Sequence, residues 1–335
     1  MLLILLLAAC GLCQSAALRC SRQIGQFSPG VSLRYKEALT PGAADAALRY
    51  ARSEQNAGAV VPTFWREDEL TMQAPASGRV RQALCLGFDG QANAVYGADY
   101  LAGTAPGSGS TAACAVSAPL AWSLWGSQDV CGQTLTLQTA DGKESRYLVC
   151  GIFCCGEELL LYTAGSGQAF SCLELTNVSR DHPTQSVRQF LAGAGLGEPE
   201  RICYDEAMAW CADGLARLPQ TLLAAACLAG LLFGLPWSRT LRRLLWFAAA
   251  LAAALLLPGW LAGLPGWLVP DRWGSIAAWS ALLEAGRERL SDWMTLVPTA
   301  RDVLVRLRLI ETCLGVTGSL LCGLAACLVW VLSRK

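Results

Sequence analysis

Apolar residues collect in four runs that contain no charged side chain. These runs cover residues 1–18, 218–237, 244–269 and 312–332. A helix needs about 20 apolar residues to cross the hydrocarbon layer of a bilayer, so the last three runs predict membrane spans and the first, at 18 residues, is slightly short. Residues 19–215 mix polar and apolar positions as a folded domain does. The pattern therefore predicts a first helix, one large domain and three further helices.

Turn and capping residues inside residues 19–215 predict a domain of the α+β class. Ser117 can cap a helix that has Pro119 near its start and Gly126 just past its end. Leu135 and Leu137 share one face of a strand, and Asp141-Gly142 is typical of a hairpin turn. Helices are predicted at 43–53, preceded by the cap residue Thr40 and by Pro41, between Ser117 and Gly126, and at 184–192. Strands are predicted at 59–61 (ended by Pro62), 113–116, 133–139 and 147–153.

The composition supports a membrane protein. The chain has 335 residues, of which 53% are hydrophobic and only 16% are charged, against about 25% in an average soluble protein. Its formal net charge is zero, which argues against a protein that binds nucleic acid by neutralising phosphates. Membrane lipid is the expected surroundings of the apolar runs, and the localisation predicted is a cell membrane crossed several times.

Arginines predict the orientation. The short segment between the second and third runs carries Arg239, Arg242 and Arg243, and the chain ends in Arg334 and Lys335. The positive-inside rule puts both segments in the cytoplasm, which leaves the large domain on the outer side. Residues 271–311 then also lie outside, although they hold six arginines. A hairpin at Pro258-Gly259 in the third run would instead place that segment inside.

An apolar stripe runs through residues 271–311. Its members recur at helical spacing and are Ile276, Trp279, Leu283, Leu290, Trp293 and Val297. One interpretation is an amphipathic helix that lies on the membrane surface. The other is a helix packed beneath the large domain, and the sequence favours neither.

The first run permits three interpretations. It can be a retained first span, a cleaved signal ending near residues 15–17, or a lipoprotein signal with Cys10 as the modified residue. A secretory signal normally has a positively charged start, and here only the amino terminus is positive. A retained span is therefore the preferred interpretation.

Three stretches of the domain resemble a known family. They read YGADYL (96–101), CAVSAPLAWSLWGSQDVCGQTLTL (114–137) and GKESRYLVCGIF (142–153). Together they are similar to the extracytoplasmic core domain of MacB-like permeases, in the order of strand, helix ending in an aromatic residue and glycine, turn, and hairpin. The matching structural residues are Trp125, Gly126, Gly132 and Gly151. The layout of one span, an outer domain and three spans is also similar to MacB and FtsX permeases.

The resemblance implies a permease-like subunit of an ABC transporter, with an ABC ATPase and a second permease subunit as partners. Family members carry a basic coupling helix between the second and third spans. Here only residues 238–243 are available, about 9 Å of helix, without the acidic and glycine residues of that motif. Ordinary coupling to an ATPase is therefore doubtful. The alternative function is a membrane-anchored binding or scaffold protein that does not transport.

The chain offers no clear catalytic or metal-binding set. His182 is the only histidine, and no nucleophile turn of the G-x-S-x-G type is present. We therefore expect no enzyme activity, no cofactor and no metal.

The chain has 16 cysteines, and Cys150, Cys154 and Cys155 lie close together in the sequence. They lack a second pair at zinc spacing. Cys131 and Cys150 are predicted as core thiols, while disulfides in the outer domain remain the second possibility.

Overall fold

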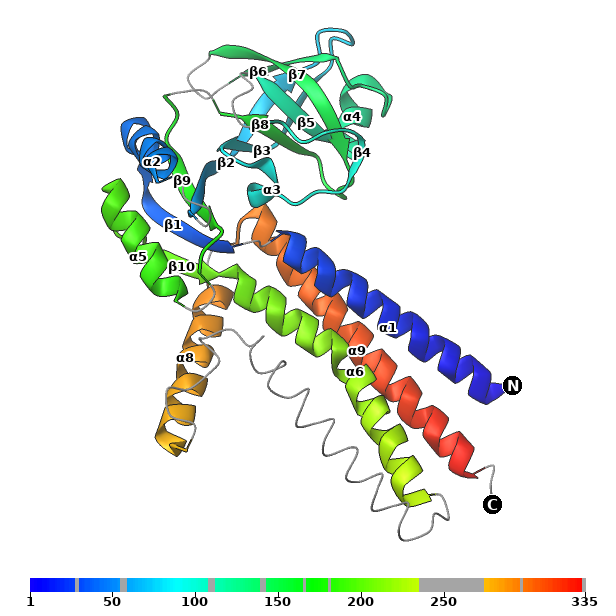
Figure 1. Cartoon of the computed structure of the whole chain (residues 1–335). Coiled ribbons are helices and arrows are strands. Elements are labelled where there is room, and N and C mark those ends of the chain that lie inside the picture. The colour runs from blue at the N-terminus through cyan, green and yellow to red at the C-terminus, as the bar shows by residue number, and fades with distance from the viewer. Residues whose placement is uncertain are drawn as a thin grey trace.

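The computed structural model of the chain describes residues 1–27, 30–54, 59–107, 112–138, 143–164, 167–179, 182–234, 274–295 and 298–332. An α/β domain lies at one end, and the long helices α1 (Leu2–Phe27), α6 (Asp205–Gly234) and α9 (Ala300–Leu332) extend from its base (Figure 1). The N-terminus and the end of α9 at Leu332 lie near the far end of these helices.

The ten strands of the described residues belong to one sheet. Their order is β10-β1-β9-β2-β3-β8-β5-β7-β4, and β6 pairs with both β2 and β7. The strands are β1 (Gly30–Leu39), β2 (Val61–Gln73), β3 (Val80–Asp89), β4 (Tyr100–Gly103), β5 (Ala113–Ser117), β6 (Thr134–Gln138), β7 (Glu144–Phe153), β8 (Leu159–Thr163), β9 (Phe170–Thr176) and β10 (Arg201–Tyr204). The shorter helices are α2 (Pro41–Ser53), α3 (Ala92–Val95), α4 (Ala118–Trp125), α5 (Pro183–Ala194) and α8 (Ile276–Thr295).

Half of the sheet closes on itself. Because β6 bridges β2 and β7, the strands β2, β3, β8, β5, β7 and β6 form a small barrel, which is the upper part of Figure 1. Its interior is filled by buried side chains, among them Met72, Cys114, Leu135 and Tyr162. The predicted alternation of β6 is confirmed, since Leu135 and Leu137 are both fully buried on one face.

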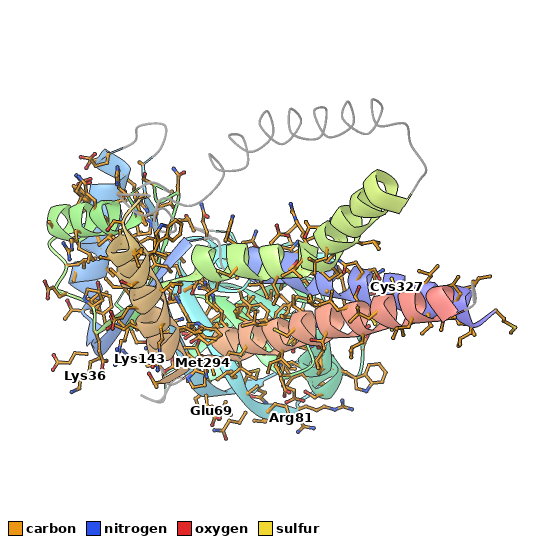
Figure 2. The ribbon with its side chains drawn as sticks, turned by 90° about the horizontal axis from the view of Figure 1, so that it is seen from below. Lys36, Glu69, Arg81, Lys143, Met294 and Cys327 are labelled. Carbon is orange, nitrogen blue, oxygen red and sulfur yellow. The ribbon has the colours of Figure 1, made fainter. Side chains whose placement is uncertain are left out.

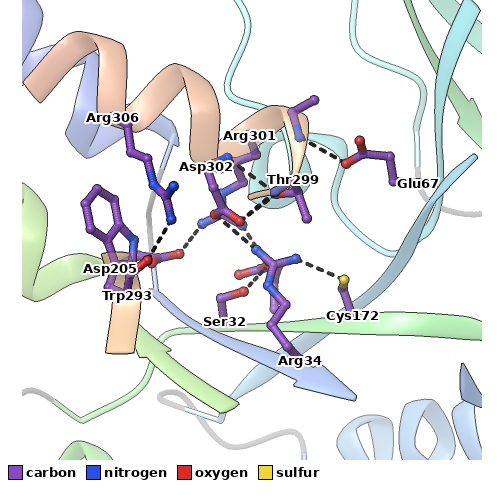
Figure 3. A network of polar contacts seen from close by, with 12 residues as sticks. Ser32, Arg34, Glu67, Cys172, Asp205, Trp293, Thr299, Arg301, Asp302 and Arg306 are labelled. Carbon is purple, nitrogen blue, oxygen red and sulfur yellow. Dashed lines mark hydrogen bonds and ion pairs between the residues drawn. The ribbon is translucent and has the colours of Figure 1, made fainter. Parts of the chain in front are cut away.

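The remaining strands form an open sheet. The strands β10, β1, β9 and the first part of β2 pack one face against α2 and α5 through Leu33, Leu173, Val187 and Phe190. The opposite face of β1 and β9 lies toward the starts of α6 and α9 (Figures 1 and 3). The open sheet meets the long helices through polar side chains, and strands of the barrel share an apolar cluster with them that includes Leu86, Leu161, Ile24 and Val305.

Local signals predicted several helices well. Thr40 and Ser117 cap α2 and α4, each accepting a hydrogen bond from the backbone N–H three residues on at 3.4 Å. Gly126 ends α4 with φ of 71°, in the left-handed region that favours glycine. The predicted hairpin turn Asp141-Gly142 lies outside the described residues.

The prediction that Pro62 ends a strand is wrong. β2 begins at Val61 and runs on to Gln73, with Pro62 paired to Leu175 of β9. The pairing of β2 with β3 begins only at Phe64, so on that side the strand is still an edge at Pro62. An edge position has no ladder partner for the N–H that proline lacks.

The long helices extend past the predicted apolar runs. α1 continues beyond Leu18 to Phe27, α6 begins at Asp205 rather than at Leu218, and α9 begins at Ala300 rather than at Thr312. The predicted boundaries at residues 18, 215 and 312 therefore fall inside helices, because polar residues continue each helix up to the domain. The segment 271–311 is divided, since α8 ends at Thr295 and the first turns of α9 belong to the same helix as the last apolar run.

Two of the described helical stretches, Leu2–Gln26 and Ala300–Val329, are long and apolar enough to cross a membrane. α6 contains Pro219, which removes one backbone hydrogen bond, and this helix changes direction along its length in Figure 1. The predicted third span, 244–269, lies outside the described residues.

Candidate functional site at the junction of domain and helices

Buried polar side chains gather where the open sheet meets the starts of α6 and α9. We call this set the junction cluster. Its residues are Ser32, Arg34, Trp65, Cys172, Glu174, Asp205, Arg301 and Asp302, and each is less than 9% exposed (Figure 3). The cluster joins three strands of the domain, β1, β2 and β9, to two long helices.

Arg301 is the central cation of the junction cluster. Its guanidinium lies 2.7 Å from Glu174 on β9 and 2.6 Å from Asp205 at the start of α6. It also donates to the backbone carbonyl oxygen of Ala94 at 3.1 Å. One side chain on α9 thereby holds a strand, a second long helix and α3.

Arg34 provides the second cation. It lies 3.3 Å from Asp302 and 4.0 Å from Glu174, and it donates to the sulfur of Cys172 at 2.9 Å. Its guanidinium carbon stands 4.7 Å from the centre of the Trp65 ring, which suits a cation–π contact. Arg34 therefore connects β1 to the first turn of α9.

Glu174 is the carboxylate that both cations share. The same oxygen of Glu174 accepts hydrogen bonds from Ser32 at 2.6 Å and from the indole N–H of Trp65 at 2.9 Å. Neutral donors add to the two guanidinium groups, which lowers the cost of burying the carboxylate.

A carboxylate of α9 itself and a carboxylate of β2 cap the first turn of α9. Asp302 accepts hydrogen bonds from the backbone N–H of Thr299 at 3.0 Å and from its hydroxyl at 2.8 Å. Glu67 of β2 accepts from the backbone N–H of Ala300 at 3.0 Å. These contacts satisfy N–H groups that a helix start leaves unpaired, and they tie α9 to the domain.

Alternation along two strands explains why polar groups face the helices. Val31 and Leu33 point to the core under α2 and α5, so Ser32 and Arg34 point to the other face. On β9, Leu173 and Leu175 point to the same core, so Cys172 and Glu174 point to the opposite face. The register of β1 and β9 pairs Ser32 with Glu174 and Arg34 with Cys172. Adjacent polar positions therefore meet on the face toward the helices.

Burial changes the acidity of the carboxyl groups. Desolvation raises the pKa of Asp205 to about 7, because Arg301 offsets only part of the penalty and the nearby Glu174 adds to it. Desolvation also raises the pKa of Glu67, against the lowering effects of the Ala300 N–H and of Arg34. Burial in the junction cluster therefore opposes the ionisation of Asp205, and Arg301 favours it.

Charged residues on all three long helices end at a similar level below the junction cluster. The last charged residues toward the far end are Arg19 on α1, Arg217 on α6 and Glu311 on α9. Cys20 donates to Glu311 at 3.3 Å, and Gln14 donates to the carbonyl oxygen of Ala216 at 2.7 Å.

Because of these two contacts, the last charged residues of the three helices lie within about two helical turns of one another along the helix axes. We call this level the charge boundary. Below it, residues 312–332 alone give about 31 Å of uncharged helix, close to the thickness of a bilayer core.

The residues singled out in the sequence lie elsewhere. Trp125 packs partly buried against the barrel core, and Gly126 follows it at the end of α4. Gly132 has φ of 86° in the turn before β6, and a Cβ on Gly151 of β7 would contact the backbone oxygen of Thr104. These four residues shape the barrel and take no part in the junction cluster. Arg239, Arg242 and Arg243 lie outside the described residues.

The structure contradicts one of the two predictions of a core thiol. Cys85, Cys114 and Cys172 are buried, and the described cysteines form no disulfide with one another. Cys150 is half-buried, but the prediction of Cys131 as a core thiol is wrong, since it is exposed in the turn after Val130. No group of three or more metal-ligating side chains occurs among the described residues.

Sequence reasoning missed the junction cluster. The available signal was alternation of Ser32 and Arg34 with apolar residues in GVSLR (30–34), and of Glu174 with leucines in CLEL (172–175). Such residues are normally read as solvent-facing. Only the packing of α6 and α9 against this face reveals that they are buried.

The fold and the junction cluster define a class of protein: an α/β domain joined, through buried ion pairs, to long apolar helices. No family model matches the chain, and no curated protein matches it. Among solved structures, it is similar to the periplasmic region of MacB from Actinobacillus actinomycetemcomitans, at 10% identity and a TM-score of 0.40, covering 56% of this chain and 94% of that one.

Two further structures are similar to the chain. One is the extracellular domain of the noncanonic ABC-type transporter YknZ from Gram-positive bacteria, at 11% identity and a TM-score of 0.37, covering 51% of this chain and 96% of that one. The other is a domain assigned to a permease of Porphyromonas gingivalis, at 14% identity and a TM-score of 0.32, covering 50% of this chain and 84% of that one.

Proposed function

We propose that the chain is a permease-like membrane subunit of the MacB and FtsX type whose outer domain and membrane helices move together. Four apolar helices hold it in the membrane: α1, the apolar part of α6, residues 244–269, and α9 below the charge boundary. The large domain lies on the outer side. This layout is supported by the shared charge boundary and by the sequence resemblance of the domain.

The observation that carries the proposal is the junction cluster. Arg301 binds Glu174 of the sheet and Asp205 of α6 at once, and all three side chains are nearly inaccessible to water. A buried ion pair holds a defined geometry, because displacing one partner leaves an uncompensated charge. A tilt of α6 or α9 is therefore passed to β1 and β9 rather than absorbed by a flexible linker.

Topology is tested with protease on intact cells. We expect cleavage within residues 19–215 and protection of residues 238–243. Labelling from the cytoplasm of a cysteine introduced near residue 141 would contradict the orientation.

The partners are tested by purification from native membranes. Residues 238–243 offer three arginines and no apolar face, whereas stable protein recognition buries roughly 800 Å² on each partner. We therefore propose that the chain does not itself drive an ATPase and associates with a second, complete permease through its spans or its domain. Replacing Arg239, Arg242 and Arg243 by alanine should leave that complex intact.

An ATPase that co-purifies with this chain alone, and is lost in the triple variant, would contradict this arrangement. The same short loop favours the second candidate function, a membrane-anchored binding or scaffold protein. Absence of both an ATPase and a second permease from the purified complex would support that function over transport.

A further inference from the structure

One side of α8 carries a narrow stripe of exposed apolar residues. The exposed fractions are 88% for Ile276, 38% for Trp279, 70% for Leu283, 49% for Leu290 and 59% for Met294. At 3.6 residues per turn, these positions fall within a stripe about 60° wide. Exposed aliphatic side chains aligned in this way, rather than scattered, mark a surface that another apolar phase covers.

A different face of α8 holds the helix to the rest of the molecule. Trp293 is 7% exposed, and Arg306 of α9 donates to its carbonyl oxygen at 2.7 Å and stands 5.0 Å from its ring centre. Trp293, which the sequence assigns to the same apolar stripe, is buried here, and Val297 lies outside the described residues. The stripe residues of α8 are therefore directed away from this attachment.

The attached end of α8 lies close to the charge boundary. Arg306 lies five residues before Glu311 on α9, so the attached end of α8 is about 8 Å above the boundary. α8 is about 30 Å long. In Figure 1 it extends away from the barrel, as the long helices do, but diverges from them toward the lower left, and in Figure 2 it crosses the direction of α9. Its first turns, with Ile276, Trp279 and Leu283, form the end of α8 that is farther from the attachment to α9.

We propose that the α8 stripe inserts into the lipid surface of the membrane beside the long helices, with Ile276 and Leu283 among the acyl chains and Trp279 at the level of the headgroups. Trp residues favour this level because the ring is apolar and its N–H is polar. Arg287 borders the stripe, where a long cationic side chain can reach lipid phosphates. Glu284 and Glu288 lie farther around the helix, on the side turned to water.

This inference rests on the proposed membrane function and adds a partner, the bilayer lipid, to it. It also makes α8 a link between the bilayer surface and α9. Lipid contacts fix one end of α8, Arg306 links the other end to α9, and α9 begins in the junction cluster. The surface of the bilayer thereby becomes a reference point for the orientation of the domain.

Quenching of tryptophan fluorescence by brominated lipid tests the inference on the full-length protein. The protein is reconstituted in vesicles of phosphatidylcholine brominated near the headgroup end of the acyl chains. Because the chain has 12 tryptophans, the signal of one is obtained by difference between wild type and a Phe variant. We expect loss of a lipid-quenched component in Trp279→Phe and no such loss in the matched control Trp293→Phe.

A second pair of variants tests the stripe as a whole. Leu283→Glu places a charge on the stripe and should abolish lipid quenching of Trp279. Ala281→Glu places the same charge on another exposed side of α8 and should leave quenching unchanged. A Trp279 component that brominated lipid does not quench would overturn the inference, whether aqueous acrylamide reaches the ring or a second protein surface shields it.

The same samples separate the two proposals. If the protein resists extraction by alkaline carbonate but Trp279 is not quenched, the α8 inference fails and the membrane function stands. If carbonate extracts the protein, the proposed function fails as well.

Discussion

Removal of the Arg301 guanidinium is the most direct test of the junction cluster. Arg301→Met keeps a long side chain of helix-forming type but leaves Glu174 and Asp205 without their principal cation. The Arg301 side chain is 1% exposed, and its partners are 2% and 8% exposed, so water cannot replace it. Breaking a buried ion pair by removing one partner costs roughly 3–5 kcal/mol.

Arg308 provides a matched control on the same helix. It pairs with Glu311 at 2.6 Å, the same distance that joins Arg301 to Asp205, but the two side chains are 34% and 49% exposed. An exposed pair contributes about 0–1 kcal/mol, because solvent screens it. We therefore expect Arg308→Met to change stability little.

The assay is pulse proteolysis of the full-length protein in lipid nanodiscs across a urea series, following the disappearance of the intact domain. A triple variant that combines Arg301→Met with Glu174→Gln and Asp205→Asn tests the cause. It should recover a large part of the lost stability, since no uncompensated charge is buried. Equal, small losses for the Arg301 and Arg308 variants would refute the reasoning, and so would a triple variant less stable than Arg301→Met.

Three further predictions concern single positions. The raised pKa of Asp205 means that the folded state binds a proton more tightly than the unfolded state, so its contribution to stability falls as pH rises from about 4 to about 7, and Asp205→Asn should remove that part of the pH dependence in urea midpoints. Gly151→Val should destabilise the domain by roughly 1–3 kcal/mol, because the added Cβ contacts a neighbouring backbone carbonyl; Gly156→Ala, with open space around it, should not, and equal unfolding midpoints would contradict this. A Cβ on Gly315 of α9 would lie 3.0 Å from two atoms of α1, whereas Gly323 has nothing within 4 Å, so Gly315→Leu and not Gly323→Leu should lower the yield of an engineered α1–α9 cross-link.

Local patterns predicted the elements whose cause is itself local. Thr40 and Ser117 cap helices because a hydroxyl can reach an N–H three residues on, and Gly126 ends α4 because glycine tolerates a positive φ. The alternation of Leu135 and Leu137 predicted the buried face of β6 for the same reason. Uncharged runs likewise predicted where the long helices are apolar, although not where they begin and end.

The candidate site could not be predicted in this way. Arg34 and Glu174 look like ordinary exposed positions of amphipathic strands, and Arg301 looks like one of six arginines in a polar segment. They become a site because residues 142 and 268 positions apart in the chain come together, as Ser32 with Glu174 and Arg34 with Asp302 do. Only long-range packing determines that these side chains lose contact with water.

The sequence by itself determined that the chain has uncharged helical runs, an α+β domain between them and an amphipathic stripe in residues 271–311, because composition and periodicity are properties of neighbouring residues. The tertiary structure decided the closure of the barrel by β6, the burial of the junction cluster and the side of α8 that stays exposed. Each of these depends on which surfaces pack against each other in the fold. The free energy of burying a charge or an apolar side chain depends on the groups that surround it and not on the residue type alone.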